Sequence, residues 1–209
     1  MVLKVKICGV SSEETLDAAV VGGATHIGFN FFAKSPRSVA PERAAALVKR
    51  LPRNVIPVAL VVNEDRARID AIRAQTGITT IQLHGEESPE FAASLGGEVW
   101  KAIPVKTRDD LSAASCFAGA VSHLLYDAKP PKSADLPGGT GMRFDWSLLD
   151  NFAHPLPWLL AGGLDAANVT EAVGRTGARF VDVASGVESA PGIKDVDKIA
   201  AFLKAAADL

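Results

Sequence analysis

Short apolar runs alternate with longer, alanine-rich stretches of helical period along the whole chain. The two kinds of segment recur at a spacing of roughly 25 residues, which is typical of strand–helix units. The apolar runs predict strands at Leu3–Cys8, Thr25–Phe31, Val55–Val62, Thr79–Leu83, Glu98–Ile103, Val121–Asp127, Trp158–Ala161 and Arg179–Val183. The periodic stretches predict helices at Ser12–Val21, Pro41–Leu51, Asp65–Thr76, Pro89–Leu95, Asp109–Ala118, Ser147–Asn151, Asn168–Arg175 and Lys194–Ala207.

Strands that alternate with helices predict a parallel sheet covered by helices. A closed barrel and an open doubly wound sheet both satisfy this pattern, and eight units favour closure. We therefore expect an α/β protein with a (β/α)8 TIM barrel. No linker rich in proline, glycine or serine interrupts the units, so residues 1–209 are expected to form a single domain. The longest loop, Ala128–Arg143, follows the sixth predicted strand, where a mobile lid over an active site would fit.

Composition and charge exclude several classes of protein. Hydrophobic residues make up 48% of the 209 residues and charged residues 22%, as in an ordinary globular protein. A net charge of −2 leaves no basic footprint for nucleic acid. The chain has no secretory apolar segment and no long apolar stretch, so we expect a cytoplasmic protein without a membrane partner. Its two cysteines, Cys8 and Cys116, are too far apart in sequence to suggest a local motif, and no histidine spacing predicts a metal site.

Reactive residues and glycines stand where six of the predicted strands end. The active sites of such barrels lie at the carboxyl ends of their strands, so these residues are the candidates for chemistry. The segments concerned are Lys6-Ile7-Cys8-Gly9, Ser35-Pro36-Arg37, Gln82-Leu83-His84-Gly85, Asp127, Ala161-Gly162-Gly163-Leu164 and the run from Asp182 to Glu188.

Two glycine-bearing loops follow the seventh and eighth predicted strands. They contain Gly162-Gly163 and Ser185-Gly186. Each is compatible with an ordinary tight turn, but in barrels of this kind backbone N–H groups at these two positions commonly bind phosphate. Glycine suits that role because the backbone must approach the anion closely. The pair therefore predicts a small phosphorylated substrate.

The first predicted strand carries polar residues on one face. Lys4, Lys6 and Cys8 alternate with aliphatic residues that would pack against the helices, so Cys8 is expected to point into the mouth of the barrel. The alternative is a cysteine that serves as a small buried apolar residue. Asp182 on the neighbouring eighth strand also points inward in this register, which predicts an ion pair with Lys6. A nearby ammonium would favour the thiolate of Cys8, whose ordinary pKa is about 8.5.

Three further side chains have both a structural and a functional interpretation. Asp127 precedes a loop, where an aspartate often bonds its own backbone, but it also ends a strand at the predicted active site. His84 either serves the structure or contacts a ligand. Arg37 lies in a polar loop, where a solvated side chain is usual, yet its planar fork would suit a substrate carboxylate if it turned inward.

Taken in order, these segments resemble phosphoribosylanthranilate isomerase of tryptophan biosynthesis. The resemblance runs from Lys6 to Asp195, with one departure at Ala184, where a serine is expected. Besides the strand-end segments above, it rests on Gly28-Phe29, Gly138-Gly139-Thr140-Gly141, Phe144-Asp145-Trp146, Asn168-Val169, Gly192 and Lys194-Asp195.

The resemblance implies an Amadori rearrangement of N-(5′-phosphoribosyl)anthranilate to an aminodeoxyribulose phosphate without metal or cofactor. It implies that Cys8 is the general base and Asp127 the general acid, and it associates Arg37 with the anthranilate carboxylate. Other residues expected at the substrate are His84, Gly138, Gly139 and Asp182, with Gly162, Gly163, Ser185 and Gly186 at its phosphate.

Two other functions remain open on the sequence. The related histidine-pathway isomerase carries out the same rearrangement on another phosphoribosyl substrate, but it resembles a duplicated half-barrel with aspartates in both roles. A catalytically inactive barrel that binds a phosphorylated metabolite is the second alternative, although binding alone needs neither Cys8 nor Asp127. The sequence fits a monomer or a homodimer equally well.

Overall fold

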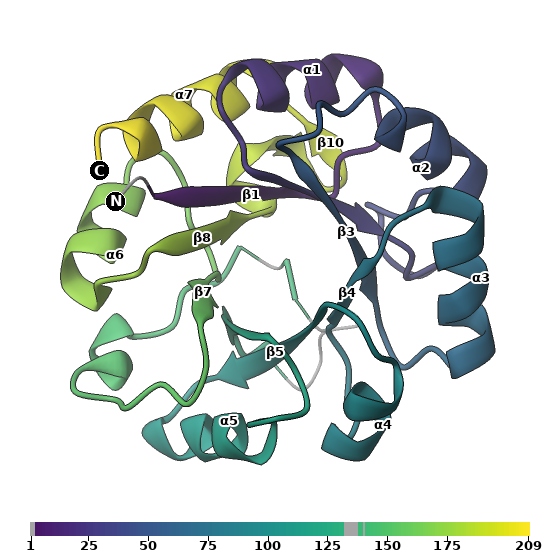
Figure 1. Cartoon of the computed structure of the whole chain (residues 1–209). Coiled ribbons are helices and arrows are strands. Elements are labelled where there is room, and N and C mark those ends of the chain that lie inside the picture. The colour runs from purple at the N-terminus through teal and green to yellow at the C-terminus, as the bar shows by residue number, and fades with distance from the viewer. Residues whose placement is uncertain (1–2, 132–137, 140) are drawn as a thin grey trace.

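Parallel strands close into a barrel in the computed structural model, which describes residues 3–131, 138–139 and 141–209 (Figure 1). The order of strands around the barrel follows the sequence, so the last strand pairs with the first. The predicted fold class and all eight predicted strands are confirmed, with ends that differ by at most two residues. The strands are β1 (Lys4–Cys8), β2 (His26–Asn30), β3 (Ile56–Val61), β4 (Thr80–Leu83), β5 (Val99–Val105), β6 (His123–Ala128), β7 (Trp158–Leu160) and β8 (Phe180–Val183).

Helices form a ring around the barrel (Figure 1). Side chains cap the starts of several helices: Ser12 accepts a hydrogen bond from the backbone N–H of Thr15, and Asp65 accepts one from that of Arg68. The helices are α1 (Glu13–Val21), α2 (Pro41–Val48), α3 (Arg66–Thr76), α4 (Pro89–Ser94), α5 (Ala113–Cys116), α6 (Val169–Thr176) and α7 (Val196–Ala207).

Two predicted helices are wrong in type and extent. The segment predicted as 109–118 is a 3-10 turn, η1 (Arg108–Ser112), followed by the single-turn α5. Asp110 accepts hydrogen bonds from the backbone N–H groups of Lys106 and Thr107, which ties it into the preceding loop. The segment predicted as 147–151 is the 3-10 turn η2 (Trp146–Leu149), and Asn151 just beyond it has a left-handed φ of 55°.

The predicted start of the last helix is also wrong. Lys194 belongs to a short strand, β10 (Ile193–Lys194), which pairs with β9 (Glu188–Ala190) in a hairpin that the sequence pattern did not indicate. The 3-10 turn η3 (Ser185–Val187) connects β8 to this hairpin. Helix α7 begins after Asp195 because the Asp195 carboxylate accepts hydrogen bonds from the N–H groups of Asp197 and Lys198.

The strands bury both faces. Their outward aliphatic residues, among them Val5 and Ile7 of β1, form a large core with the helices. A separate, smaller core fills the barrel below its mouth and consists of Val58, Trp100, Ala102, Leu125, Leu159, Ala161 and Phe180. This alternation confirms that Lys6 and Cys8 face inward, as strand parity predicts.

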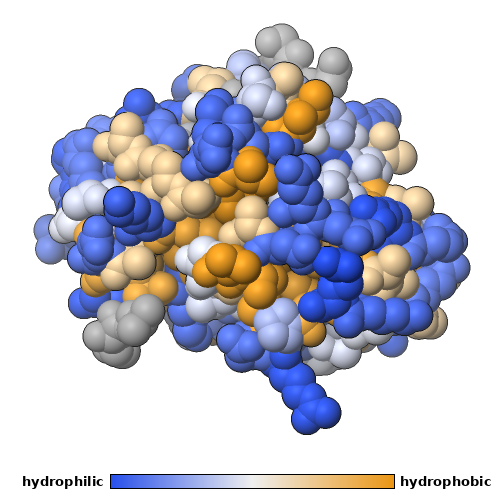
Figure 2. Space-filling model, turned by 90° about the horizontal axis from the view of Figure 1, so that it is seen from above, coloured by the Kyte–Doolittle hydropathy of each residue, from blue (hydrophilic) through white to orange (hydrophobic). Residues whose placement is uncertain are grey.

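The outer surface is of mixed polarity. Figure 2 shows the side of the barrel that α1 and α7 cover, where apolar residues lie among hydrophilic ones. None of the described helices combines the length and the apolar character that crossing a membrane requires. Most of the predicted lid (residues 128–143) is described, but residues 132–137 and 140 lie outside the described part.

Candidate active site

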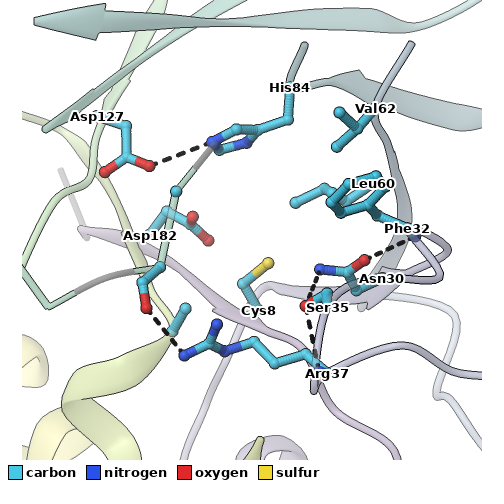
Figure 3. A pocket seen from close by; sticks show the side chains of 13 residues that line it. Cys8, Asn30, Phe32, Ser35, Arg37, Leu60, Val62, His84, Asp127 and Asp182 are labelled. Atoms are coloured by element: carbon cyan, nitrogen blue, oxygen red, sulfur yellow. Dashed lines mark hydrogen bonds and ion pairs between the residues drawn. The ribbon is translucent and has the colours of Figure 1, made fainter. Parts of the chain in front are cut away.

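A pocket opens at the carboxyl ends of the strands (Figure 3). It contains most of the residues predicted for the site, although they come from strands far apart in the sequence. The Cys8 sulfur points into the space between His84 and Arg37. The pocket is lined by Cys8, Asn30, Phe32, Ser35, Arg37, Leu60, Val62, His84, Asp127, Gly138, Gly139, Asp182 and Ala184.

A second pocket adjoins the first and shares Asp127, Gly139, Asp182 and Ala184 with it. The loops after β7 and β8 line it, including Gly162, Gly163 and Ser185. Gly162 and Gly163 have left-handed φ angles of 84° and 63°, which favour glycine at both positions. The two loops predicted to bind phosphate therefore lie together beside the predicted acid.

Gly186 has a different place from the other three residues predicted at the phosphate. It does not line either pocket. A Cβ at this position would collide with the backbone carbonyl of Leu164, so glycine is required where the turn after β8 packs against the loop after β7. The close packing of the backbone at Gly186 on Leu164 thus holds the two loops together.

The predicted ion pair inside the barrel is present. Lys6 Nζ lies 2.8 Å from Asp182 Oδ1, and both side chains are buried. Burial alone would lower the pKa of Lys6, but the charges of Asp182 and Cys8 outweigh it, so the pKa of Lys6 is raised. Lys6 therefore stays an ammonium one layer below the thiol.

Two opposing effects act on the Cys8 thiol. Burial raises its pKa, and the ammonium groups of Lys6 and Lys194 act in the opposite direction. Lys6 thus favours the thiolate as expected, but burial is the larger effect and the pKa of Cys8 is raised overall.

Asp127 makes a local backbone contact and also faces the pocket. Its Oδ1 accepts a hydrogen bond from the N–H of Ala128 at 2.8 Å, the local contact that the loop position suggests. Its Oδ2 lies 3.2 Å from Nε2 of His84, within the pocket. Gln82 lies behind the histidine, with Nε2 3.0 Å from Nδ1 of His84. One carboxylate oxygen thus fixes the side chain and the other faces the site.

The loop that carries His84 is fixed by a buried carboxylate. Glu87 accepts hydrogen bonds from the N–H groups of Gly85 and Asn63. It also pairs with Lys101 at 2.9 Å, and both of these side chains are buried. These contacts join the loops after β3 and β4 to Lys101 within β5, which holds the histidine at the rim of the pocket.

Arg37 turns inward rather than into solvent. Its Nε and Nη2 each lie 2.8 Å from one oxygen of Glu188, and Nη2 also donates to the carbonyl of Gly139 at 3.0 Å. The side chain is 6% exposed and lines the pocket. Bidentate pairing fixes the plane of the guanidinium and leaves Nη1 to meet an anion in the pocket.

Glu188 and Lys194 belong to this site, although sequence reasoning assigned them no role. Lys194 Nζ lies 2.7 Å from Glu188 Oε1 and donates to the carbonyl of Ala184 at 2.8 Å. Burial would raise the pKa of Glu188, but Arg37 and Lys194 outweigh it and lower the pKa. The only available signal was that both residues lie in segments that carry the family resemblance.

The described residues contain no group of three or more histidine, cysteine or acidic side chains placed to hold a metal ion. The reactive groups at the mouth are a thiol, a carboxylate paired with an imidazole, and a fixed guanidinium. Fold and site together define a (β/α)8-barrel enzyme with acid–base groups at the carboxyl ends of its strands.

Comparison with known proteins identifies the family. Residues 5–205 match the family described as N-(5′-phosphoribosyl)anthranilate (PRA) isomerase. A relative of that name from Zymomonas mobilis subsp. pomaceae is 48% identical, with 98% of each chain covered. Another from Paramagnetospirillum magneticum is 49% identical and covers 99% of this chain and 98% of its own. The chain therefore belongs to the N-(5′-phosphoribosyl)anthranilate isomerase family and is an aldose–ketose isomerase of tryptophan biosynthesis.

Solved structures agree with this assignment over the full chain. The crystal structure of phosphoribosyl anthranilate isomerase from Thermotoga maritima is 35% identical, with a TM-score of 0.90 and 100% of both chains covered. A phosphoribosyl anthranilate isomerase in complex with reduced 1-(o-carboxyphenylamino)-1-deoxyribulose 5-phosphate is 34% identical, with a TM-score of 0.88 and 100% of both chains covered.

Proposed function

We propose that the chain converts N-(5′-phosphoribosyl)anthranilate to 1-(2-carboxyphenylamino)-1-deoxyribulose 5-phosphate with Cys8 as general base and Asp127 as general acid. One observation carries the assignment of roles: the thiol of β1 and the carboxylate of β6 face one pocket from different sides of the barrel. Two groups that approach a sugar from different sides can protonate one atom and deprotonate another.

The chemistry divides between the two groups. Asp127 gives its proton to the furanose ring oxygen as the bond from that oxygen to C1′ breaks, and the nitrogen lone pair forms an iminium ion. The iminium acidifies the neighbouring C2′–H, and the Cys8 thiolate removes this proton. The resulting enolamine tautomerises to the ketone, so the atoms of substrate and product balance without an added reactant.

The remaining site residues are assigned by charge and position. Arg37 binds the anthranilate carboxylate through the part of its guanidinium that Glu188 leaves free. Gly162, Gly163 and Ser185 bind the phosphate with backbone N–H groups of the second pocket. Gly186 supports that pocket through its packing on the loop after β7.

His84, Gly138, Gly139 and Asp182 line the pocket between these two ends of the substrate. The relative whose structure holds a carboxyphenylamino deoxyribulose phosphate supports a site of this kind, because that molecule carries both anionic groups.

We further propose that residues 1–209 form one catalytic domain that acts in the cytoplasm as a monomer or a homodimer. One similar structure is described as monomers of a dimeric enzyme from Thermotoga maritima, so both oligomeric states occur among proteins of similar structure. Light scattering on the purified protein distinguishes the two states.

The roles are tested by following the fluorescence of freshly prepared phosphoribosylanthranilate with the wild type and with Cys8→Ala and Asp127→Asn. Each variant is expected to lower kcat by about 10²–10⁴-fold, the usual contribution of a positioned acid or base, while circular dichroism stays unchanged. Cys116→Ala is the matched control, because Cys116 is exposed and lies outside both pockets.

Turnover close to wild type in either active-site variant would remove that residue from its role. Binding of the substrate without turnover by the wild type would instead indicate the inactive metabolite-binding barrel.

A further inference from the structure

We propose that Gln82 is a positioning residue that fixes the tautomer of His84, so that His84 stabilises the carboxylate left when Asp127 gives up its proton. This inference rests on the acid role of Asp127 proposed above. The observation behind it is a row of three side chains that begins inside the barrel and ends at the pocket: Gln82, His84 and Asp127.

The distances allow hydrogen bonds along the whole row. Gln82 Nε2 lies 3.0 Å from His84 Nδ1, and His84 Nε2 lies 3.2 Å from Asp127 Oδ2. Gln82 is completely buried on β4, and His84 follows directly after that strand. Asp127 is held from its other side by the N–H of Ala128. The imidazole is therefore enclosed between a fixed amide and a fixed carboxyl group.

The chemistry of the three groups permits one consistent arrangement when Asp127 is ionised. A carboxylate only accepts hydrogen bonds, so Nε2 of His84 must carry the hydrogen. The neutral ring then has a bare Nδ1, which needs a donor, and the amide N–H of Gln82 supplies it. A carbonyl or carboxylate oxygen in the place of this amide nitrogen would favour the opposite tautomer.

The tautomer matters to the reaction because of what Nε2 presents to Asp127. With a hydrogen on Nε2, His84 donates to the carboxylate that forms as the ring oxygen takes the proton. With a bare Nε2, the histidine would accept the Asp127 proton and turn it away from the substrate. Gln82 does not line the pocket, so it acts on catalysis through His84.

A purely structural side chain would suit this position better if it were apolar. No group among the described residues donates a hydrogen bond to Gln82 Oε1, although this atom is buried. An unpaired buried carbonyl is unfavourable, and such groups in native proteins often mark functional sites. The amide keeps one useful hydrogen bond, to His84, while its oxygen has no donor among the residues that the structure describes.

The direct test is ¹⁵N NMR of the histidine rings in the wild-type protein. The protein has four histidines, and the signals of His84 are identified by their loss in a His84→Gln variant. At a pH where the ring is neutral, we expect a protonated Nε2 and a bare Nδ1. A protonated Nδ1 in the wild type would overturn the proposal. This readout needs neither turnover nor an active variant.

Kinetics supply the second test. Gln82→Met removes the donor at similar volume, and Gln82→Glu replaces it with an acceptor that should move the hydrogen of His84 to Nδ1. Both variants are expected to lower kcat by about tenfold or more, a part of the roughly 10²–10⁴-fold that a positioned acid contributes, with KM changed far less. Thr80→Val on the same strand, also buried, is the control for altered packing and should retain kcat.

The double variant Gln82→Met with Asp127→Asn separates this inference from the proposed function. If Gln82 acts through Asp127, adding Gln82→Met to Asp127→Asn should lower kcat little further. Full additivity, or unchanged kcat in both single Gln82 variants, would overturn the positioning role even if Asp127→Asn is inactive. Normal turnover by Asp127→Asn itself would instead overturn the acid role.

Discussion

At the residue scale, Cys8, the proposed base, is buried in the same barrel that supplies the positive charges around it. Burial raises the pKa of the Cys8 thiol, whereas Lys6 and Lys194 favour the thiolate. Asp182 pairs with Lys6 and acts against the thiolate, so the cation most closely placed to help is partly neutralised. The pH at which Cys8 becomes a thiolate depends on the balance of these nearby charges.

This balance predicts the pH dependence of turnover. The proposed base acts as a thiolate and the pKa of Cys8 is raised, so kcat/KM should rise with pH through an alkaline limb set by Cys8. Lys194→Met removes a cation that favours the thiolate and should move this limb to still higher pH, with the loss of rate greatest at neutral pH. Steady-state rates from pH 6 to 10 measure the limb.

The exposed neighbour Lys198 provides the control for that experiment. Lys198, on α7, donates to the backbone carbonyl of Glu188, but it is not among the main groups that shift the pKa of Cys8. Lys198→Met should leave the limb in place. A limb that stays fixed in Lys194→Met as well would show that this ammonium does not act on the thiol.

Strand parity and strand ends were enough to predict most of the pocket. Cys8 ends β1 and Asp127 is the second-last residue of β6, and period-two alternation fixes the face on which they lie. Glu188 could not be assigned in this way, because its partner Arg37 lies 151 positions away and only the closed barrel brings the two together. Local pattern places a residue on a face, but it does not name its partner across the barrel.

At the scale of elements, the barrel interior changes character from one end to the other. The mouth carries charged side chains such as Arg37, Asp127 and Asp182, whereas the amino-terminal end contains a layer of rings from β2, β5, β6 and β8. His26 packs against Phe180 with ring centroids 4.6 Å apart, and against Trp100 at 5.5 Å. His123 completes this layer at 5.2 Å from Trp100. These rings support the strands from below and take no part in the site.

Because of this layer, the free energy of unfolding should decrease at acidic pH. Burial lowers the pKa of His26 from 6.5 to about 3, so in that interval the unfolded chain binds a proton that the folded chain does not. The contribution of His26 to the free energy of unfolding is fully present above pH 6.5. It falls as the pH drops toward 3, by about 1.4 kcal/mol per pH unit. Urea unfolding at pH 7 and pH 5 measures the loss.

His26→Gln should show a smaller loss between these two pH values. Part of the loss will remain, because burial also lowers the pKa values of His123 and His154. Equal losses in wild type and variant would mean that His26 is not the neutral buried group that the layer requires.

The elements themselves were predictable to different degrees. Strands were predicted well because burial on both faces produces continuous apolar runs. The helices after β5 and β6 were not, because both segments are short and side chains bond to the backbone at their starts, Asp110 in the first and Asp145 in the second, where 3-10 turns form. The β9–β10 hairpin was missed since its second strand is two residues long, too short for any periodic signal.

At the scale of the whole molecule, closure depends on pairing the first strand with a strand near the end of the chain. β1 and β8 are joined by backbone pairing from Lys4 to Ile7, and in the middle of that register Lys6 stands opposite Asp182. Their ion pair is the polar contact inside the barrel at this seam. A charge left alone here would be buried without a partner, so the two residues should behave as one unit.

A double-mutant cycle at the seam tests this coupling. Lys6→Met leaves the Asp182 carboxylate buried and unpaired, and Asp182→Leu does the same to the ammonium, so each should lower the free energy of unfolding by about 3–5 kcal/mol. The double variant removes both charges and should recover most of the loss, while kcat stays low because Asp182 lines the pocket and Lys6 favours the Cys8 thiolate.

The exposed pair Arg66–Asp70 is the control, where removal of either partner should cost less than about 1 kcal/mol. Urea denaturation measures all of these values. Losses that simply add in the double variant would mean that closure of the barrel does not depend on the pair, and that the two charges at the seam serve only the site above them.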